Sequence, residues 1–283
     1  MWLSKSARDL KILRFGSGTV GPTLWLVIML LVGCSSIPAT FHPKEPLPPT
    51  GVTHQLWRQV LENSVTNGLV NYPVIQKEAR FGAYLRLLDR VDPSSLPGRD
   101  QQLAFWINAY NAFAVQNILE GDSPAPYIGW YYYFKVHRHA VGGETVNLYD
   151  LEHAILRAQF NEPRVHFAIV CASVSCPRLQ PWAYEGRQLE QQLDQVAREF
   201  VNDPSRNRFD REQKVAHLSK IFDWFKDDFV ANAGSVQKFV ARYVLDTEVQ
   251  RDLIADTYRI EYREYDWGLN GTPPRKVEHV RSS

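Results

Sequence analysis

The chain has 283 residues, of which 45% are hydrophobic and 12% aromatic, and its 32 basic and 31 acidic side chains leave a formal net charge of +1. A near-neutral chain without a clustered basic stretch is not expected to bind nucleic acid. Its length suits one large domain or two small ones, and its aromatic residues provide ample material for a core.

The first 33 residues have the pattern of a secretory signal peptide. Basic side chains lead into an apolar run that is shorter than the roughly twenty residues a membrane-spanning helix needs. The run ends in LVGC (31–34), which resembles the bacterial lipobox, in which the cysteine is acylated and becomes the mature N-terminus. We therefore predict removal of residues 1–33 and attachment of the protein to the lipid bilayer through acylated Cys34. The alternatives are an uncleaved anchor or a chance cysteine after an ordinary signal.

The predicted mature chain divides into three parts. Residues 34–51 are rich in proline and predict an extended tether, residues 52–270 a single domain, and residues 271–283 a mobile polar tail. Loss of residues 1–33 removes four basic side chains and Asp9, so the formal net charge becomes −2. We expect the protein in the cell envelope. Because residue 35 is Ser and not Asp, a Gram-negative host would place it in the outer membrane, facing the periplasm.

Three helices are predicted in the first part of the domain. The spacing of apolar residues indicates helices over residues 54–65 and 75–91. The third helix, 101–120, is apolar on nearly all sides except at Asn108 and Asn111, which indicates a buried position. Because a buried unpaired amide costs about 1–3 kcal/mol, these two side chains either tie neighbouring loops together or line a pocket.

An aromatic run occupies residues 127–134. It predicts either a loop folded over the core or a lid or platform for flat or sugar-like ligands. Residues 136–148 then predict a hairpin that turns at Gly142-Gly143.

Several candidate site residues lie on the next two predicted elements. Asp150 is expected to cap a helix over residues 151–160, which places Glu152 in the first turn and His153 beside it. The apolar run 165–171 predicts a buried central strand, with His166 on one face and Cys171 on the other. The chain then turns at Cys176-Pro177, and chemistry often gathers in loops at strand ends.

The remaining pattern predicts a helix at 187–201, a hairpin or edge strand at 208–218, helices at 220–230 and 235–244, and a late strand at 259–266. Together these elements predict an α+β fold, in which helices pack around a small central sheet that contains the strand at 165–171.

Six sequence blocks resemble, in the same order, the signature blocks of the DUF547 family: FWINAYNA (105–112), LEHAILR (151–157), RVHFAIVC (164–171), CP (176–177), IFDWFKDDF (221–229) and YDWGLN (265–270). The similarity extends from about residue 55 to residue 270. It implies one conserved domain, but the family is named for its unknown function. The resemblance therefore leaves the activity open.

Three hypotheses for the activity follow from the residue types. The principal one is a non-catalytic lipoprotein that binds an envelope component or a partner protein, with the buried polar residues forming a structural network. The alternative is a cysteine-dependent hydrolase or transferase acting on envelope substrates, which needs a thiolate, a nearby base and a group that orients the base. The candidates for these roles are Cys176 and Cys171 as nucleophile, His166 and His153 as base, and Glu152, Asn108 and Asn111 as the orienting group.

Cys176 is the preferred nucleophile, because a turn near a helix start would lower its pKa. A disulfide between Cys171 and Cys176 is left open, and it would remove both thiols from nucleophilic use. A third hypothesis is a metal site, since His153, His166, Glu152 and a cysteine suit zinc, although their spacing is not that of a known site. The sequence has no phosphate-binding loop, dinucleotide fingerprint or paired CxxC, so we predict no cofactor.

Overall fold

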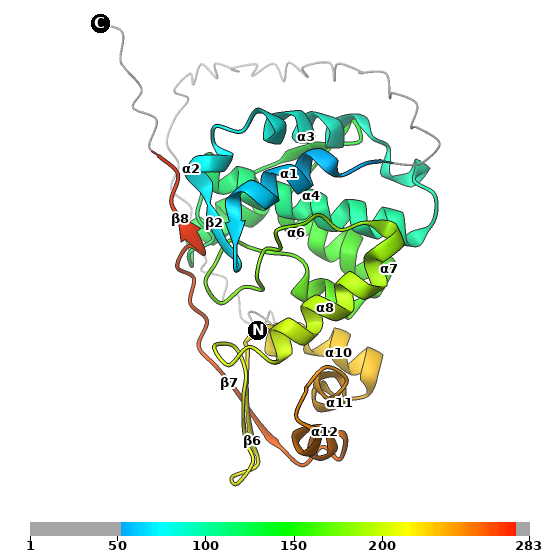
Figure 1. The fold of residues 1–283 in the computed structure, drawn as a ribbon, viewed down its shortest axis with the longest axis vertical. Helices are drawn as coiled ribbons and strands as arrows, with labels where there is room; N and C mark the ends of the chain where they lie inside the picture. The colour runs from blue at the N-terminus through cyan, green and yellow to red at the C-terminus, as the bar shows by residue number, and fades with distance from the viewer. Residues whose placement is uncertain (1–51, 276–283) are drawn as a thin grey trace, which may run out of the picture. The chain divides into compact units, whose positions relative to one another are not determined.

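The computed structural model of the chain describes residues 52–275 (Figure 1). The predicted signal peptide (1–33), the lipidation site at Cys34 and the tether (34–51) lie outside these residues. The described part is mainly helical with small sheets of two or three strands, which confirms the α+β class. No helix between residues 52 and 275 is long and apolar enough to span a bilayer.

The α-helices of the described part are α1 (Gln55–Ser64), α2 (Tyr72–Ile75), α3 (Ala79–Arg90), α4 (Arg99–Leu119), α5 (Ile128–Tyr131), α6 (Leu148–Asp150), α7 (Ala158–Phe160), α8 (Leu189–Val201), α9 (Ile221–Trp224), α10 (Lys226–Ala233), α11 (Val236–Ala241) and α12 (Thr247–Ile254). The 3₁₀ helices are η1 (Pro93–Ser95), η4 (Pro163–Phe167) and η5 (Gly186–Gln188), and the π-helical segments are η2 (Tyr132–Val136) and η3 (Leu151–Arg157).

The eight strands in the described part are β1 (Val65–Thr66), β2 (Leu69–Asn71), β3 (His139–Val141), β4 (Glu144–Val146), β5 (Arg208–Asp210), β6 (Val215–Leu218), β7 (Arg259–Tyr262) and β8 (Gly271–Thr272). They form the sheets β1-β2-β8, β3-β4 and β5-β6-β7. The hairpin β3-β4 turns at Gly142-Gly143, as the sequence predicts. Strand β8 runs parallel to β2, so the end of the domain returns to its beginning (Figure 1).

Helix α4 is buried on nearly all sides, as its composition predicts. The helix shows almost no polar face, and Asn108 and Asn111 are 0% and 2% exposed. A second part of the core is aromatic: the ring of Phe167 lies 4.8 Å from Phe200 and 5.8 Å from Phe229, measured between centroids. These contacts fix η4 against α8 and α10, and η4 leads directly into the cysteine-containing loop.

The predicted central strand at 165–171 is wrong. Pro163 starts a 3₁₀ helix that runs to Phe167, and the Glu162 side chain caps it by accepting a hydrogen bond from the Arg164 amide at 3.1 Å. Proline suits the first position of a helix because its φ is already near the helical value and its missing N–H is not needed there. A short apolar run that is buried on all sides does not distinguish a strand from a helix by periodicity.

Other boundaries also differ from the sequence prediction. Part of the aromatic run is helical, in α5 and η2, and is not simply a loop. The helix expected from residue 151 starts at Leu148, because Asn147 and not Asp150 is its cap: Asn147 accepts a hydrogen bond from the Asp150 amide at 2.7 Å. The paired part of the chain also extends beyond residue 270, through β8.

Candidate functional site

The loop from Cys171 to Cys176 is held by a segment that lies almost a hundred residues later in the chain. The Asn270 amide donates to the Ala172 carbonyl at 3.0 Å, and the Val174 amide donates to the Gly268 carbonyl at 2.7 Å. Ala172 has φ +63°, in the left-handed region that favours glycine. The backbone beside Cys171 is therefore strained, and contacts with residues 268–270 keep it in place.

Three polar groups surround the sulfur of Cys171. Its Sγ lies 2.9 Å from Cys176 Sγ, 2.9 Å from Ser173 Oγ and 3.3 Å from the Tyr265 hydroxyl. When Cys171 is a thiolate, all three groups can donate hydrogen bonds to it. Burial raises the pKa of Cys171, but these hydrogen bonds outweigh burial and lower the pKa to about 7.

Cys176 differs from Cys171 in both exposure and acidity. Cys176 is 4% exposed, whereas Cys171 is half-buried. Burial, followed by the hydrogen bond with Cys171 and its charge, raises the pKa of Cys176 well above its ordinary value. The expectation that Cys176 is the more acidic thiol is therefore reversed. Cys176 lies inside the core and donates a hydrogen bond to the Cys171 sulfur, and both effects favour its protonated form. Both cysteines are free.

Asn111 holds the backbone directly before the cysteine loop. Its side chain donates to the Ala168 carbonyl at 2.9 Å and accepts from the Val170 amide at 2.8 Å. Asn108 makes the same double contact elsewhere, with the backbone N–H and carbonyl of Tyr184 at 2.9 Å and 2.8 Å. Both amides tie a loop to α4. Only Asn111 does so next to a cysteine.

A second polar cluster joins η3 to α10 and η4. Asp228 forms a bidentate ion pair with Arg157 at 2.7 and 2.9 Å, and it accepts a hydrogen bond from His166 Nε2 at 2.8 Å. Arg157 also donates to His153 Nδ1 at 3.2 Å. The segment η3 is π-helical, a local geometry that often occurs at functional sites.

The histidines of this cluster are held neutral. Burial lowers the pKa of His166, and burial together with the positive charge of Arg157 lowers the pKa of His153 to about 4. Burial opposes ionisation of Asp228, but hydrogen bonds from His166 and Arg157 hold its pKa well below the ordinary value. The charged pair in the cluster is therefore Arg157 with Asp228.

Glu152 lies between the two clusters. Its Oε1 is 4.0 Å from His166 Nδ1, a buried atom with no hydrogen-bond partner, and its Oε2 accepts from the Tyr110 hydroxyl at 3.5 Å. Burial, and then the charge of Cys171, raise the pKa of Glu152 to about 8. Glu152 is therefore protonated at neutral pH and lies within electrostatic range of Cys171. Between residues 52 and 275, however, no hydrogen bond links Cys171 to Glu152 or to His166.

The structure thus brings most of the candidate residues into two neighbouring clusters, and leaves Asn108 apart from them. Sequence reasoning did not assign a role to Ser173, Tyr265, Arg157 or Asp228. Tyr265 and Asp228 lie within the family-like blocks 265–270 and 221–229. Their position in these blocks is the sequence feature that could have marked them as site residues. For the metal hypothesis, the described part of the chain contains no group of three His, Cys, Asp or Glu side chains placed to hold an ion.

An aromatic surface adjoins Cys171. The Tyr265 ring lies 4.7 Å from Trp224 and 4.5 Å from Trp267, measured between centroids, and Trp224 is 42% exposed. The hydroxyl of Tyr265 thus contacts the thiol, while its ring belongs to a surface that is open to solvent.

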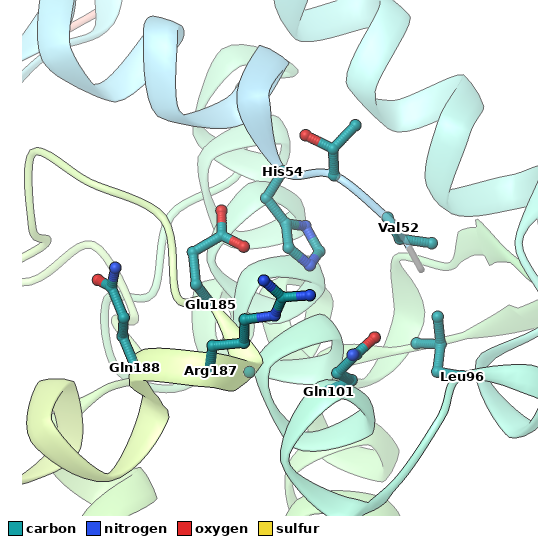
Figure 2. A pocket seen from close by; sticks show the side chains of 9 residues that line it. Val52, His54, Leu96, Gln101, Glu185, Arg187 and Gln188 are labelled. Atoms are coloured by element: carbon teal, nitrogen blue, oxygen red, sulfur yellow. The ribbon is translucent and has the colours of Figure 1, made fainter. Parts of the chain in front are cut away.

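A separate pocket has a volume of about 370 Å³. His54, Glu185 and Arg187 lie around it (Figure 2). His54 Nδ1 is bonded to the Tyr84 hydroxyl at 2.8 Å, and burial lowers the pKa of His54 to about 4. The pocket shares no residue with the two clusters described above.

Comparison with known proteins supports the family resemblance. The model of the DUF547 family, described as a protein family of unknown function, matches residues 93–201. This range includes Cys171, Cys176, Glu152 and His166. The match covers residues 93–201, so it supports a resemblance of this part of the chain to the DUF547 family. A search of curated proteins and a search of solved structures each found no match.

Proposed function

We propose that the protein is a cysteine-dependent hydrolase or transferase of the cell envelope, with Cys171 as its nucleophile. The observation that carries the proposal is the set of hydrogen-bond donors around the Cys171 sulfur, Ser173 and Cys176 at 2.9 Å and Tyr265 at 3.3 Å. A thiol with a pKa of about 7 is substantially ionised at neutral pH. It can therefore attack without a base bonded directly to it.

In this reaction the Cys171 thiolate attacks the carbonyl carbon of an ester, thioester or amide and forms an S-acyl bond. The leaving group departs with a proton, and Glu152 is the protonated acid within electrostatic range of the sulfur. A water molecule in a hydrolase, or another acceptor in a transferase, then attacks the acyl carbon and gives its proton to the Glu152 carboxylate. The product leaves and the Cys171 thiolate is restored.

The principal hypothesis from the sequence, binding without chemistry, has its own support in the exposed aromatic run. Tyr127 and Ile128 are 90% and 76% exposed, and Tyr131 and Tyr132 are each about half-exposed. A contiguous apolar patch of this kind often marks an interaction site. Binding of an envelope component or a partner protein there is the second candidate function, and it does not require Cys171.

The location in the envelope rests on the N-terminal segment. A basic start, a short apolar run and LVGC before residue 35 support cleavage and acylation at Cys34. Several acyl chains together anchor a protein stably, whereas one chain gives only marginal binding. In a Gram-negative host the catalytic domain would then face the periplasm from the outer membrane.

The test of the nucleophile is the pH dependence of Cys171 alkylation by iodoacetamide in the full-length protein, followed by mass analysis of the peptide. We expect a midpoint near pH 7, well below the value of about 8.5 for an ordinary thiol. Ser173→Ala and Tyr265→Phe each remove one donor and should raise the midpoint. Val174→Ala is the matched control, because Val174 lies in the same loop with its side chain exposed.

The second part of the test is acyl transfer from p-nitrophenyl acetate. We expect a transient acetyl group on Cys171 and release of nitrophenol that Cys171→Ser abolishes. A Cys171 that titrates like an ordinary thiol in all variants would contradict the nucleophile. A reactive thiolate that never carries an acetyl group would contradict the acyl chemistry and leave the binding function as the better description.

A further inference from the structure

The two cysteines differ in ways that suit sequential roles in one reaction. Their sulfur atoms are 2.9 Å apart, and the Cys171 backbone N–H also donates to Cys176 Sγ at 2.9 Å. Cys171 is half-buried, whereas Cys176 is 4% exposed, so Cys171 is the cysteine with more contact with solvent. Cys171 is therefore placed to react with an incoming molecule, and Cys176 is placed to react with Cys171.

The loop that carries both sulfurs is held from two sides. Arg206 donates through Nη2 to the Cys176 carbonyl at 2.6 Å and to the Val174 carbonyl at 3.1 Å. On the other side Asp266 and Ser175 exchange two hydrogen bonds, at 3.1 and 2.9 Å. The two sulfurs are thus kept close by the fold and do not depend on a chance loop conformation.

We propose that Cys171 and Cys176 form a dithiol pair that exchanges with disulfides, in which Cys171 attacks the disulfide and Cys176 resolves the product. The substrate class is a small or peptide disulfide that can reach the half-buried Cys171. This activity goes beyond acyl transfer, and it rests on the part of the proposed function that makes Cys171 a thiolate.

The exchange has two steps. The Cys171 thiolate attacks one sulfur of R–S–S–R, so a Cys171–S–S–R bond forms, the R–S–S–R bond breaks and one R–S⁻ leaves. Cys176 then gives its proton to that R–S⁻ and attacks the Cys171 sulfur. The Cys171–Cys176 bond forms and a second R–S⁻ leaves, so the two cysteines are oxidised and the disulfide is reduced to two thiols, one of them ionised.

The asymmetry of the pair favours this order of events. The attacking thiol must be ionised and accessible, and Cys171 has three hydrogen-bond donors around its sulfur. Cys176 keeps its proton, as its buried position requires, until the mixed disulfide removes the negative charge from Cys171. Once the pair is closed, neither thiol is available for acyl transfer, so oxidation would also switch off the proposed hydrolase or transferase.

The experiment uses oxidised glutathione as the disulfide and full-length protein purified in detergent. After reaction at pH 7, free thiols are alkylated and the peptides are separated by mass, which also keeps Cys34 distinct. In the wild type we expect a Cys171–Cys176 disulfide with no retained glutathione. In Cys176→Ser we expect one glutathione to accumulate on Cys171. In Cys171→Ser we expect Cys176 to react at least about tenfold more slowly, since one unit of pKa is a factor of ten in thiolate.

Val174→Ala again serves as the control, because it alters the loop without removing a sulfur or a donor, and it should behave as the wild type does. A stable glutathione adduct on wild-type Cys171 beside a free Cys176 would overturn the resolving role and leave the nucleophile intact. A Cys171 that reacts with glutathione no faster than an unfolded control would overturn both this inference and the proposed function. Circular dichroism of each variant verifies that its fold is retained.

Discussion

Asn111 holds Val170, the residue before Cys171, by accepting a hydrogen bond from its backbone amide at 2.8 Å. The same side chain also binds the Ala168 carbonyl, so one amide satisfies two buried backbone groups that a neighbouring strand would otherwise pair. Asn111 therefore helps to set the position of Cys171, the proposed nucleophile, from α4.

Replacing Asn111 by Ala should lower the free energy of unfolding by about 2–4 kcal/mol, because two buried backbone groups lose their partners. It should also change the alkylation rate of Cys171, since the loop is released. The matched control is Asn108→Ala, which removes the equivalent pair of bonds at Tyr184. Urea unfolding should show similar losses for both variants, and a change in Cys171 reactivity that is equal in both would contradict a specific role for Asn111.

Asp228→Asn should destabilise the protein at pH 7 by about 1–3 kcal/mol, because it removes the charged partner of Arg157 and weakens the bond to His166. The folded-state pKa of Asp228 is lowered, so its contribution to stability is present above the unfolded-state pKa of about 4 and is lost as the pH falls below it. The wild type should therefore lose more stability than the variant between pH 5 and pH 3. Asp227→Asn, at the exposed neighbouring position, is the control, and an equal acid sensitivity of all three proteins would refute the assignment.

Glu152→Gln tests the raised pKa of the buried carboxyl. The folded-state pKa of Glu152 is raised to about 8. The contribution of this carboxyl to stability is therefore full below the unfolded-state pKa near 4, falls as the pH rises from 4 to 8, and is lost above 8. The wild type should lose up to about 1.4 kcal/mol for each pH unit within this window, and the variant should lack this slope. Unfolding in urea at several pH values measures it, with the exposed Glu144→Gln as control. Parallel curves for the wild type and Glu152→Gln would show that Glu152 ionises normally.

Gly271→Ala should open the contact between β8 and β2. A Cβ atom at this position would overlap the Val70 backbone, including its carbonyl oxygen, and backbone cannot move aside as a side chain can. We expect a loss of about 1–3 kcal/mol in stability and faster alkylation of Cys176, because residues 268–270 then hold the loop less firmly. Gly82→Ala is the control, since its Cβ would meet only Arg86 Nη1 at 3.5 Å and alanine favours a helix. If Cys176 is alkylated no faster in Gly271→Ala than in the wild type, pairing of β8 with β2 does not help to hold the cysteine loop.

Cys34→Ser tests the anchor. Without the thiol the precursor cannot be acylated, so the protein should move out of the membrane fraction and lose the mass of the acyl groups. Unchanged fractionation together with an unchanged N-terminal mass would exclude the lipobox. Cys171→Ser is a suitable control here, because it removes a thiol outside the N-terminal segment.

The sequence alone determined the elements whose signal is local. The wholly apolar helix around Asn108 and Asn111, the amphipathic helix at α8 and the hairpin at Gly142-Gly143 follow from residue spacing and turn chemistry, and the structure has them all. The α+β class and the family-like blocks could be identified for the same reason. The two cysteines were also recognisable as candidates, since they are the thiols that remain after Cys34.

Only the tertiary structure decided the surroundings of the candidate site residues. The apolar run at 165–171 is the end of a 3₁₀ helix followed by an irregular segment, and Asn111, more than fifty residues earlier, binds its backbone in place of a strand. Cys171 is the more acidic thiol because Tyr265, 94 residues away in the chain, adds its hydroxyl to the contacts from Ser173 and Cys176. Burial and long-range hydrogen bonds depend on which segments meet, and no local pattern in the sequence encodes that.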